Sequence, residues 1–250
     1  MESPEPAHGQ AANGDHLLEV IDLRVNFRTP DGLLNAVNGI SYTLNRGQTL
    51  AILGESGSGK TVSAEAVMGI LDSPPAFVTG GTVLFDGIDL LQVSPSWRRR
   101  LCGERIAMIF QDPLTALNPA YTVGSQIAGM FQEHRGTSKR EATAKAVELM
   151  DRVRIPSARE RAHDYPHQFS GGMRQRVMIA AAIALDPDLL NAALASASST
   201  SRLVRLWAWA VASRWVKCTM YTGALSAPSS SAMDTCNGVS RYSTSRGTGR

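Results

Sequence analysis

The segment GESGSGKT, residues 54–61, constrains the fold of this chain more than any other feature. Its glycines let the backbone turn so tightly that successive N–H groups converge on one anion. A helix that starts at the loop adds its positive N-terminal end. This spacing predicts a binding site for a nucleoside triphosphate. The residues of the predicted site are Gly54, Glu55, Ser56, Gly57, Ser58, Gly59, Lys60 and Thr61.

Two side chains of the loop are expected to have separate roles. Lys60 is placed to reach the β- and γ-phosphates as a mobile positive charge, and the Thr61 hydroxyl is placed to take one position on Mg²⁺. Residues 49–53 (TLAIL) indicate a buried strand before the loop, and residues 62–71 indicate an apolar helix after it. Because strand, loop and helix follow in the order that the motif requires, a chance Gly/Ser-rich match is the weaker interpretation.

The rest of the first 190 residues alternates between strand and helix patterns. Ser138 and Glu141 form a capping box at the start of one predicted helix. The basic run at residues 98–100 indicates the solvated end of another. Strands are predicted at residues 17–27, 33–37, 40–44, 82–85 and 105–110, and helices from residue 94 to the basic run and at residues 123–132, 138–153 and 177–185.

Charge and cysteine usage exclude several classes of function. The chain of 250 residues has a formal net charge of +3, but residues 191–250 carry seven Lys/Arg and one acid, so the first 190 residues have a net charge of −3. The motif-bearing part is therefore not a basic nucleic-acid-binding core. The three cysteines have neither disulfide nor metal spacing, and no run reaches the roughly 18 apolar residues of a membrane span. Residues 1–16 are expected to be a flexible N-terminus.

Further motifs follow the loop in a fixed order. They are MIFQDP at residues 108–113, LNP at residues 117–119 and YPHQFSGGMRQRVMIA at residues 165–180. Together with GESGSGKT they resemble the ATP-binding subunits of ABC transporters, in the branch that energises importers of oligopeptides, dipeptides and nickel. The resemblance covers about residues 17–190. It implies an α/β fold with a P-loop nucleotide-binding domain, an antiparallel β flank and a helical insertion at about residues 112–176 that carries the signature.

The resemblance implies roles for the matching residues. Gln111 is similar to the glutamine that touches Mg²⁺ or the attacking water, so it joins Lys60 as a candidate catalytic residue and Thr61 as a candidate metal contact. Phe27 falls where the family places an aromatic ring against adenine, although the same strand position fits core packing almost as well.

The signature is implied to act in a dimer. Ser170, Gly171 and Gly172 resemble the residues that cap the γ-phosphate held by the opposite subunit, and Ser170 also suits a helix N-cap. The family implies ATP and Mg²⁺ as cofactors and a second ATP-binding subunit, identical or different, as a partner. It also implies transmembrane permease subunits, an indirect extracytoplasmic solute-binding protein, no nucleic acid, and a place at the cytoplasmic face of the membrane.

The family pattern breaks after residue 190. The family continues with a strand ending in Asp-Glu-Pro and later with a histidine, whereas this chain has NAALASASST at residues 191–200 and no histidine after His167. Aligned without a gap, Ala193 stands at the Mg²⁺-aspartate position and Leu194 at the catalytic-glutamate position, where neither can act on metal-bound or attacking water.

This break leads to several expectations about the rest of the chain. Residues 191–250 are expected to be an out-of-frame or rearranged, disordered tail, with the later core strands missing and residues 106–109 short of neighbours. Three functions remain open: a subunit that couples ATP binding and hydrolysis to transport, a binding-only subunit, and a non-functional truncated product.

Overall fold

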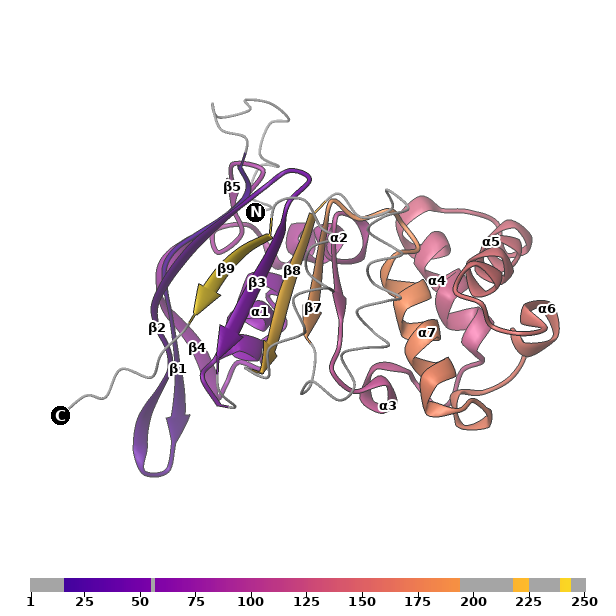
Figure 1. Cartoon of the computed structure of the whole chain (residues 1–250), viewed down its shortest axis with the longest axis horizontal. Helices are drawn as coiled ribbons and strands as arrows, with labels where there is room; N and C mark the ends of the chain where they lie inside the picture. The colour runs from indigo at the N-terminus through magenta and orange to yellow at the C-terminus, as the bar shows by residue number, and fades with distance from the viewer. Residues whose placement is uncertain (1–15, 55–56, 194–217, 225–238, 244–250) are drawn as a thin grey trace.

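The computed structural model describes residues 16–54, 57–193, 218–224 and 239–243. In these residues an antiparallel sheet, a parallel sheet and a group of helices lie side by side (Figure 1). None of the helices in these residues is long and apolar enough to cross a membrane. Glu55, Ser56 and Leu194, three of the residues singled out from the sequence, lie outside the described residues, and so does most of the segment from residue 191 onward.

The antiparallel sheet forms the flank that the sequence predicts. Its strand order is β2-β1-β4-β5. The strands are β1 (His16–Thr29), β2 (Gly32–Asn45), β4 (Ala76–Phe85) and β5 (Ile88–Asp89).

Two of these strands are longer than predicted, because each continues through a glycine that suggested a break. Residues 33–37 and 40–44 belong to one strand, β2, and residues 76–81 extend β4 ahead of the predicted start at residue 82. The pairing of β1 shifts register around Asp22, which has a φ of 47°. A Cβ at Gly39 would lie 2.6 Å from the Asp22 carboxylate, and one at Gly81 would lie 2.6 Å from the Leu23 Cα. These two glycines therefore accommodate a bulge within continuous strands, whereas their sequence pattern suggests breaks.

The parallel sheet holds the phosphate-loop strand near its centre. Its strand order is β6-β7-β8-β3-β9. The predicted strand β6 is fully buried and pairs with β7, so residues 106–109 have the neighbour that they were expected to lack. The strands are β3 (Thr49–Gly54), β6 (Ile106–Ile109), β7 (Leu189–Ala193), β8 (Cys218–Ala224) and β9 (Val239–Ser243).

Two strands of this sheet come from beyond residue 190, where the sequence predicts none. Strand β8 inserts between β7 and β3, and β9 pairs with the other side of β3. Both segments contain Thr, Val or Tyr, which favour strands, but the Ala- and Ser-rich stretches around them hide the short pattern. Their positions in the sheet depend on long-range pairing, because β3 needs a partner on each side to satisfy its backbone groups.

Ser94 and Ser138 cap helices at the predicted starts, and Thr122 caps a third helix. Each accepts a hydrogen bond from the backbone N–H three residues later. Helix α1 ends before the predicted residue 71, because the left-handed Gly69 closes it. The α-helices are α1 (Lys60–Met68), α2 (Pro95–Glu104), α3 (Pro113–Ala116), α4 (Val123–Arg135), α5 (Lys139–Arg152), α6 (Ala158–Arg161) and α7 (Gly171–Ala182).

The parallel sheet separates two hydrophobic cores. Adjacent residues of β7 point to opposite sides: Leu189 joins the core shared with α1 and the antiparallel sheet, and Leu190 joins the core shared with α4, α5 and α7. Helices α4 to α7 therefore form a unit at one end of the molecule, and the antiparallel sheet lies at the other end (Figure 1). This unit is the predicted helical insertion.

Arg98 is an exception to the prediction that the run at residues 98–100 is solvated, whereas Arg99 and Arg100 are exposed as predicted. Its guanidinium is half-buried and donates hydrogen bonds to the backbone oxygens of Ala66 (2.6 Å) and Val67 (3.0 Å). These carbonyls lie in the last turn of α1, where the Ala66 oxygen also accepts from the backbone N–H of Gly69. The arginine thus adds to the cap of α1 from a neighbouring helix, a role that depends on packing and leaves no local sequence signal.

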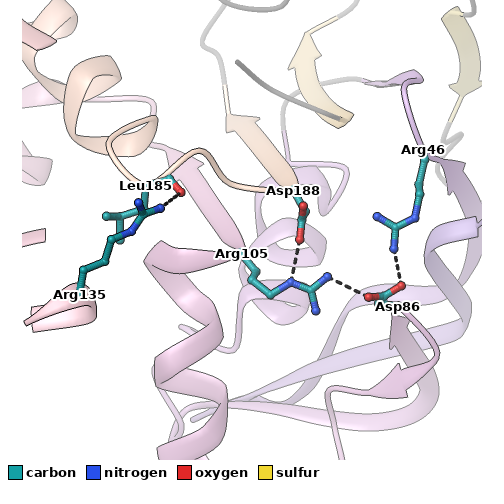
Figure 2. A network of polar contacts seen from close by, with 6 residues as sticks. All are labelled: Arg46, Asp86, Arg105, Arg135, Leu185 and Asp188. Carbon is teal, nitrogen blue, oxygen red and sulfur yellow. Dashed lines mark hydrogen bonds and ion pairs between the residues drawn. The ribbon is translucent and has the colours of Figure 1, made fainter. Parts of the chain in front are cut away.

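A network of charged side chains joins the antiparallel sheet to the parallel sheet (Figure 2). Arg105, which precedes β6, donates to the Asp86 carboxylate (2.8 Å) and to the Asp188 carboxylate (2.7 Å). Arg46, from the turn before β3, also pairs with Asp86. Asp86 follows β4 and Asp188 precedes β7, so a single guanidinium holds the ends of strands from both sheets.

We expect Asp86→Asn to reduce the acid sensitivity of folding. The hydrogen bond from Arg105, with a further contribution from Arg46, holds the pKa of the Asp86 carboxyl below its usual range. Such a carboxylate adds stability above its unfolded pKa, and that stability is lost as the pH falls through the depressed folded value, below about pH 4. Because the side chain is 36% exposed, solvent screening limits the effect to about 1 kcal/mol or less.

Denaturant unfolding at pH values from about 7 to about 3 measures this difference. Asparagine tolerates the left-handed φ of residue 86 (53°), so the turn is kept. Asp31→Asn, in the exposed β1–β2 turn, is the control and should behave like the wild type. An Asp86→Asn protein that loses stability with acid as steeply as the wild type would contradict the role of the network.

Two glycines of α4 should respond in opposite directions to alanine. A Cβ at Gly129 would meet no atom within 4 Å, so Gly129→Ala should raise the free energy of unfolding by about 0.5–1 kcal/mol. A Cβ at Gly124 would lie 2.6 Å from the Ala162 carbonyl oxygen, so Gly124→Ala should lower it by about 1–3 kcal/mol. Urea unfolding of both variants checks the pair. Equal effects would show that the packing around α4 differs from this description.

Candidate nucleotide-binding site

The phosphate loop connects β3 to α1 with the backbone that an anion cradle requires. Gly57 and Gly59 have φ values of 77° and 83°, in the left-handed region that glycine adopts without strain. Gly59 is the N-cap of α1 and has no side chain to occupy the N–H groups of the first helical turn. The N–H groups at the start of a helix point along its axis, so the loop presents donors and a positive dipole end to a phosphate.

Lys60 lies over the loop that it is predicted to serve. Its ammonium donates to the Gly54 carbonyl (2.8 Å) and to the Ser58 hydroxyl (3.1 Å). Partial burial lowers the pKa of the Lys60 ammonium, because desolvation disfavours its charged form. A phosphate bound in the loop would place a negative charge beside the Lys60 ammonium. Thr61 is exposed beside it, at the start of α1, as the predicted Mg²⁺ contact requires.

Strand β2 packs directly against the phosphate loop, and the sequence does not reveal this contact. A Cβ at Gly59 would lie 2.2 Å from the Ala36 carbonyl oxygen and 3.3 Å from a Val37 methyl group. The loop backbone therefore packs directly on β2, and any side chain at residue 59 would push it away. Glycine is required at this position by the close approach as well as by the positive φ.

Phe27 is half-buried on β1 and packs against the core shared by α1 and the antiparallel sheet. Its partner across the hairpin is Leu34 on β2, which is 58% exposed. Both alternatives for Phe27, core packing and contact with a base, are compatible with this position, because one part of the ring is packed and the other is accessible.

Gln111 follows β6 and is exposed. Because β3 and β6 belong to the same parallel sheet, their carboxyl ends meet at one edge, which lies at the lower end of Figure 1. Two strands separate them, so the strand ends are about 14 Å apart across the sheet. The structure thus brings Gln111 to the edge that holds the phosphate loop.

The signature residues lie apart from the phosphate loop of the same chain. Ser170 is the N-cap of α7, as predicted, but its hydroxyl makes no capping bond; its backbone oxygen accepts from Met173 and Arg174 instead. Helix α7 packs on α3, α4, α5 and β6, whereas α1 packs on β1, β2, β3, β7 and β8. Figure 1 shows α7 in the helical unit and α1 behind the central strands.

Strand β7 ends at the position where the family's acidic residue is expected. Ala193 is its last residue and pairs with Thr222 of β8, at the same edge as the loop. Asn191, on the same strand, is fully buried, and neither of its amide atoms has a hydrogen-bond partner among the described residues. An unpaired buried amide costs about 1–3 kcal/mol, so this strand is less stable than an apolar one would be.

A strand, a glycine loop with its lysine, and a helix at the carboxyl edge of a parallel sheet define a P-loop nucleotide-binding protein. A profile of the ABC transporter family matches residues 37–192, which is more than half of the chain. The chain therefore belongs to the ABC transporter family.

Similar proteins with assigned roles indicate a branch of the ABC transporter family. The oligopeptide transport ATP-binding protein OppD of Bacillus subtilis (strain 168) is 47% identical over 176 residues, covering 70% of this chain and 49% of OppD. OppD of Salmonella typhimurium is 48% identical over 191 residues, covering 76% of this chain and 54% of its own length. The chain thus spans about half the length of the curated relatives it matches.

Solved structures confirm the fold. The dimeric ATP-binding cassette MJ0796 bound to ADP and Pi superposes with a TM-score of 0.73 at 19% identity, covering 92% of this chain and 97% of that chain. CbiO1 of Clostridium perfringens, part of an ABC transporter complex, gives a TM-score of 0.68 at 23% identity, covering 91% and 85%. The predicted α/β fold with a P-loop core and an antiparallel flank is therefore confirmed.

We expect Lys60→Ala to weaken ATP binding by about 10- to 100-fold, because it removes a charge-assisted contact to the phosphates. Isothermal titration with ATP measures the change, and the thermal midpoint shows that the variant remains folded. Lys139→Ala, at the start of α5 in the helical unit, is the charge-matched control and should bind like the wild type. Unchanged affinity in Lys60→Ala would contradict the placement of the phosphates in this loop.

Proposed function

We propose that the chain is the ATP-binding subunit of an ABC importer and that it couples ATP binding and hydrolysis to the transport of peptides or similar solutes. The observation that carries this proposal is the phosphate loop, with left-handed Gly57 and Gly59, an open helix N-terminus and Lys60 across it. The OppD relatives, whose names describe oligopeptide transport ATP-binding proteins, support the branch.

The residues present fit ATP. The loop supplies N–H donors for the phosphates, Lys60 supplies the mobile charge, and Phe27 lies on the hairpin beside the loop. Bound ATP supplies a phosphoanhydride whose cleavage releases free energy for transport. Mg²⁺ fits less completely, because Thr61 and Gln111 offer two neutral oxygens and the strand end at Ala193 offers no carboxylate. Bound phosphates would therefore have to supply most of the remaining ligands of a Mg²⁺ ion.

A second ATP-binding subunit is the proposed partner at the signature. Gly171 and Gly172 have no left-handed φ, and a Cβ on either would meet nothing within 4 Å. Nothing within the described chain requires glycine at these positions, although glycine in a helix costs about 0.5–1 kcal/mol relative to alanine. The approach of a second subunit would explain why both residues are glycines, because a γ-phosphate held by that subunit would reach these exposed N–H groups.

The remaining partners follow from the proposed branch. We propose that permease subunits bind the chain at the cytoplasmic face of the membrane and that a solute-binding protein on the other side delivers the solute to them. Because solute selection lies with those partners, the chain contributes the ATP-dependent step and none of the specificity.

The end of β7 favours a second candidate, a binding-only subunit. A methyl group at Ala193 cannot organise metal-bound water as a carboxylate does. In this candidate the chain binds ATP at residues 54–61 and contributes Ser170 to the site of an intact partner subunit. Only the partner subunit hydrolyses ATP.

ATP binding and phosphate release by the purified chain separate these candidates. If the chain couples binding to hydrolysis, we expect fluorescent ATP to bind with a Lys60-dependent affinity and phosphate to be released. If it is a binding-only subunit, ATP should bind in the same way while phosphate release stays at background. Release that disappears in Lys60→Ala would support hydrolysis by this chain and show that Ala193 is not disabling. Release that survives Lys60→Ala would identify a contaminating ATPase. A chain that neither binds nor releases would overturn both candidates and favour a non-functional product.

A further inference from the structure

We propose that a cavity in the helical unit is a binding site for a free apolar amino acid of about the size of leucine. The cavity lies between α4, α5 and the connection that leads from α7 to β7, and its volume is about 170 Å³. An apolar cavity of about 150 Å³ is large enough to hold benzene, so this one has room for the side chain of leucine. The site is separate from the proposed ATP site and does not depend on it.

The cavity lies at the end of α7 that is remote from the signature. Helix α7 begins beside Ser170, and the cavity is lined by residues that follow the last residue of the helix, Ala182. The 12 residues of the helix span about 18 Å. The connection after α7 enters β7 at its amino end, whereas the phosphate loop lies at the carboxyl ends of the strands (Figure 1). A ligand in the cavity therefore contacts neither the signature nor the phosphate loop.

Buried apolar side chains form the floor of the cavity. Phe131 of α4 and Leu149 of α5 are each 5% exposed, and Ile183 after α7 is 0% exposed. All three belong to the hydrophobic core of the helical unit. An apolar side chain placed on this floor would be removed from water, which favours binding.

Three of the charged side chains that line the cavity already have partners of opposite charge. The Lys145 ammonium lies 2.7 Å from a carboxylate oxygen of Glu141, and a guanidinium nitrogen of Arg152 lies 3.8 Å from a carboxylate oxygen of Glu148. The Lys145 ammonium also lies over the Phe131 ring, 5.4 Å from its centroid. Because these charges compensate one another, they give the cavity no net preference for an anion or a cation.

The other two charged side chains of the lining, Arg135 and Asp186, have opposite signs. Neither forms an ion pair with another described residue. Arg135, the last residue of α4, donates to the Leu185 carbonyl oxygen (2.9 Å), which is a neutral acceptor (Figure 2). A guanidinium has five N–H groups, so Arg135 keeps donors for a carboxylate. Asp186 is exposed beside it and keeps its negative charge for an ammonium group.

These two charges favour a zwitterion over a simple anion or a simple cation. The carboxylate of an amino acid can accept from Arg135 while its ammonium group faces Asp186. An anion of the same size would be repelled by Asp186, and a cation would be repelled by Arg135. An amino acid carries both charges on the carbon atom that bears its side chain, so the side chain reaches the apolar floor while the charges stay at the rim.

Ligand-observed NMR titrations of the purified chain test this selectivity. Leucine is compared with two analogues that keep its branched chain: 3-methylbutylamine lacks the carboxylate, and 4-methylpentanoate lacks the ammonium group. Glycine keeps both charges and lacks the side chain. We expect leucine to bind with a Kd of about 1 mM, and each of the other three ligands to bind at least about 5-fold more weakly.

Two substitutions each remove one charge from the rim. Asp186→Asn keeps a residue that tolerates the left-handed φ of 55°, and it should weaken leucine binding about 5-fold without weakening 4-methylpentanoate binding. Arg135→Gln should weaken leucine binding about 5-fold without weakening 3-methylbutylamine binding. Asp151→Asn and Arg140→Gln change exposed charges of α5 that do not line the cavity, so these matched controls should bind leucine like the wild type.

Several outcomes would overturn the proposal. Equal affinities for leucine and either charged analogue would show that the site does not recognise a zwitterion. Glycine binding as tight as leucine binding would show that the apolar floor takes no part. Wild-type leucine affinity in both Asp186→Asn and Arg135→Gln would place leucine elsewhere on the chain. If the wild type unfolds cooperatively on heating but binds no leucine at about 20 mM, the cavity is not an amino-acid site.

Lys60→Ala distinguishes this site from the proposed ATP site. The variant should lose affinity for ATP and keep its affinity for leucine, because the cavity has no contact with the phosphate loop. Loss of leucine binding in Lys60→Ala would contradict the separation of the two sites.

Discussion

The close packing of the phosphate loop on strand β2 is the constraint on which the site depends. At Gly59 the backbone lies so near the Ala36 carbonyl that a single Cβ would be 2.2 Å from the oxygen, and the positive φ of Gly59 turns the chain into α1. This contact attaches the loop, a feature of the parallel sheet, to the antiparallel flank. It also sets where the hairpin stands relative to the phosphates, so any base contact by Phe27 follows from it.

A second attachment holds the two sheets together at another point. Arg105 joins the carboxylates of Asp86 and Asp188, and Arg46 joins Asp86 from the turn before β3 (Figure 2). Screening by solvent keeps the strength of such exposed pairs low, but together they orient strand ends that share no hydrogen-bond ladder. The loop contact and this network therefore connect the antiparallel sheet to the parallel sheet at two separate places.

Local features were predictable from the sequence, and features with distant partners were not. The loop glycines, the caps at Ser94 and Ser138 and the buried strand β6 each depend on a few consecutive residues, and all were predicted. The continuity of β2 through Gly39 depends on a bulge in another strand. The arginines before β6 likewise acquire roles only through packing, since Arg98 finds its acceptors at the end of α1 and Arg105 finds them beside β4 and β7. Strands β8 and β9 have short patterns that only their pairing with β3 makes recognisable.

The sequence by itself determined the chemistry that the loop can perform and the family to which the chain belongs, because residue types at fixed spacing encode a phosphate cradle directly. The tertiary structure decided which surfaces meet: that Gln111 shares an edge with the loop, that Ser170 begins a helix in a different unit from α1, and that Leu34 shares a face with Phe27. These relations depend on strand register and sheet order, which are set by long-range pairing and packing and not by neighbouring residues.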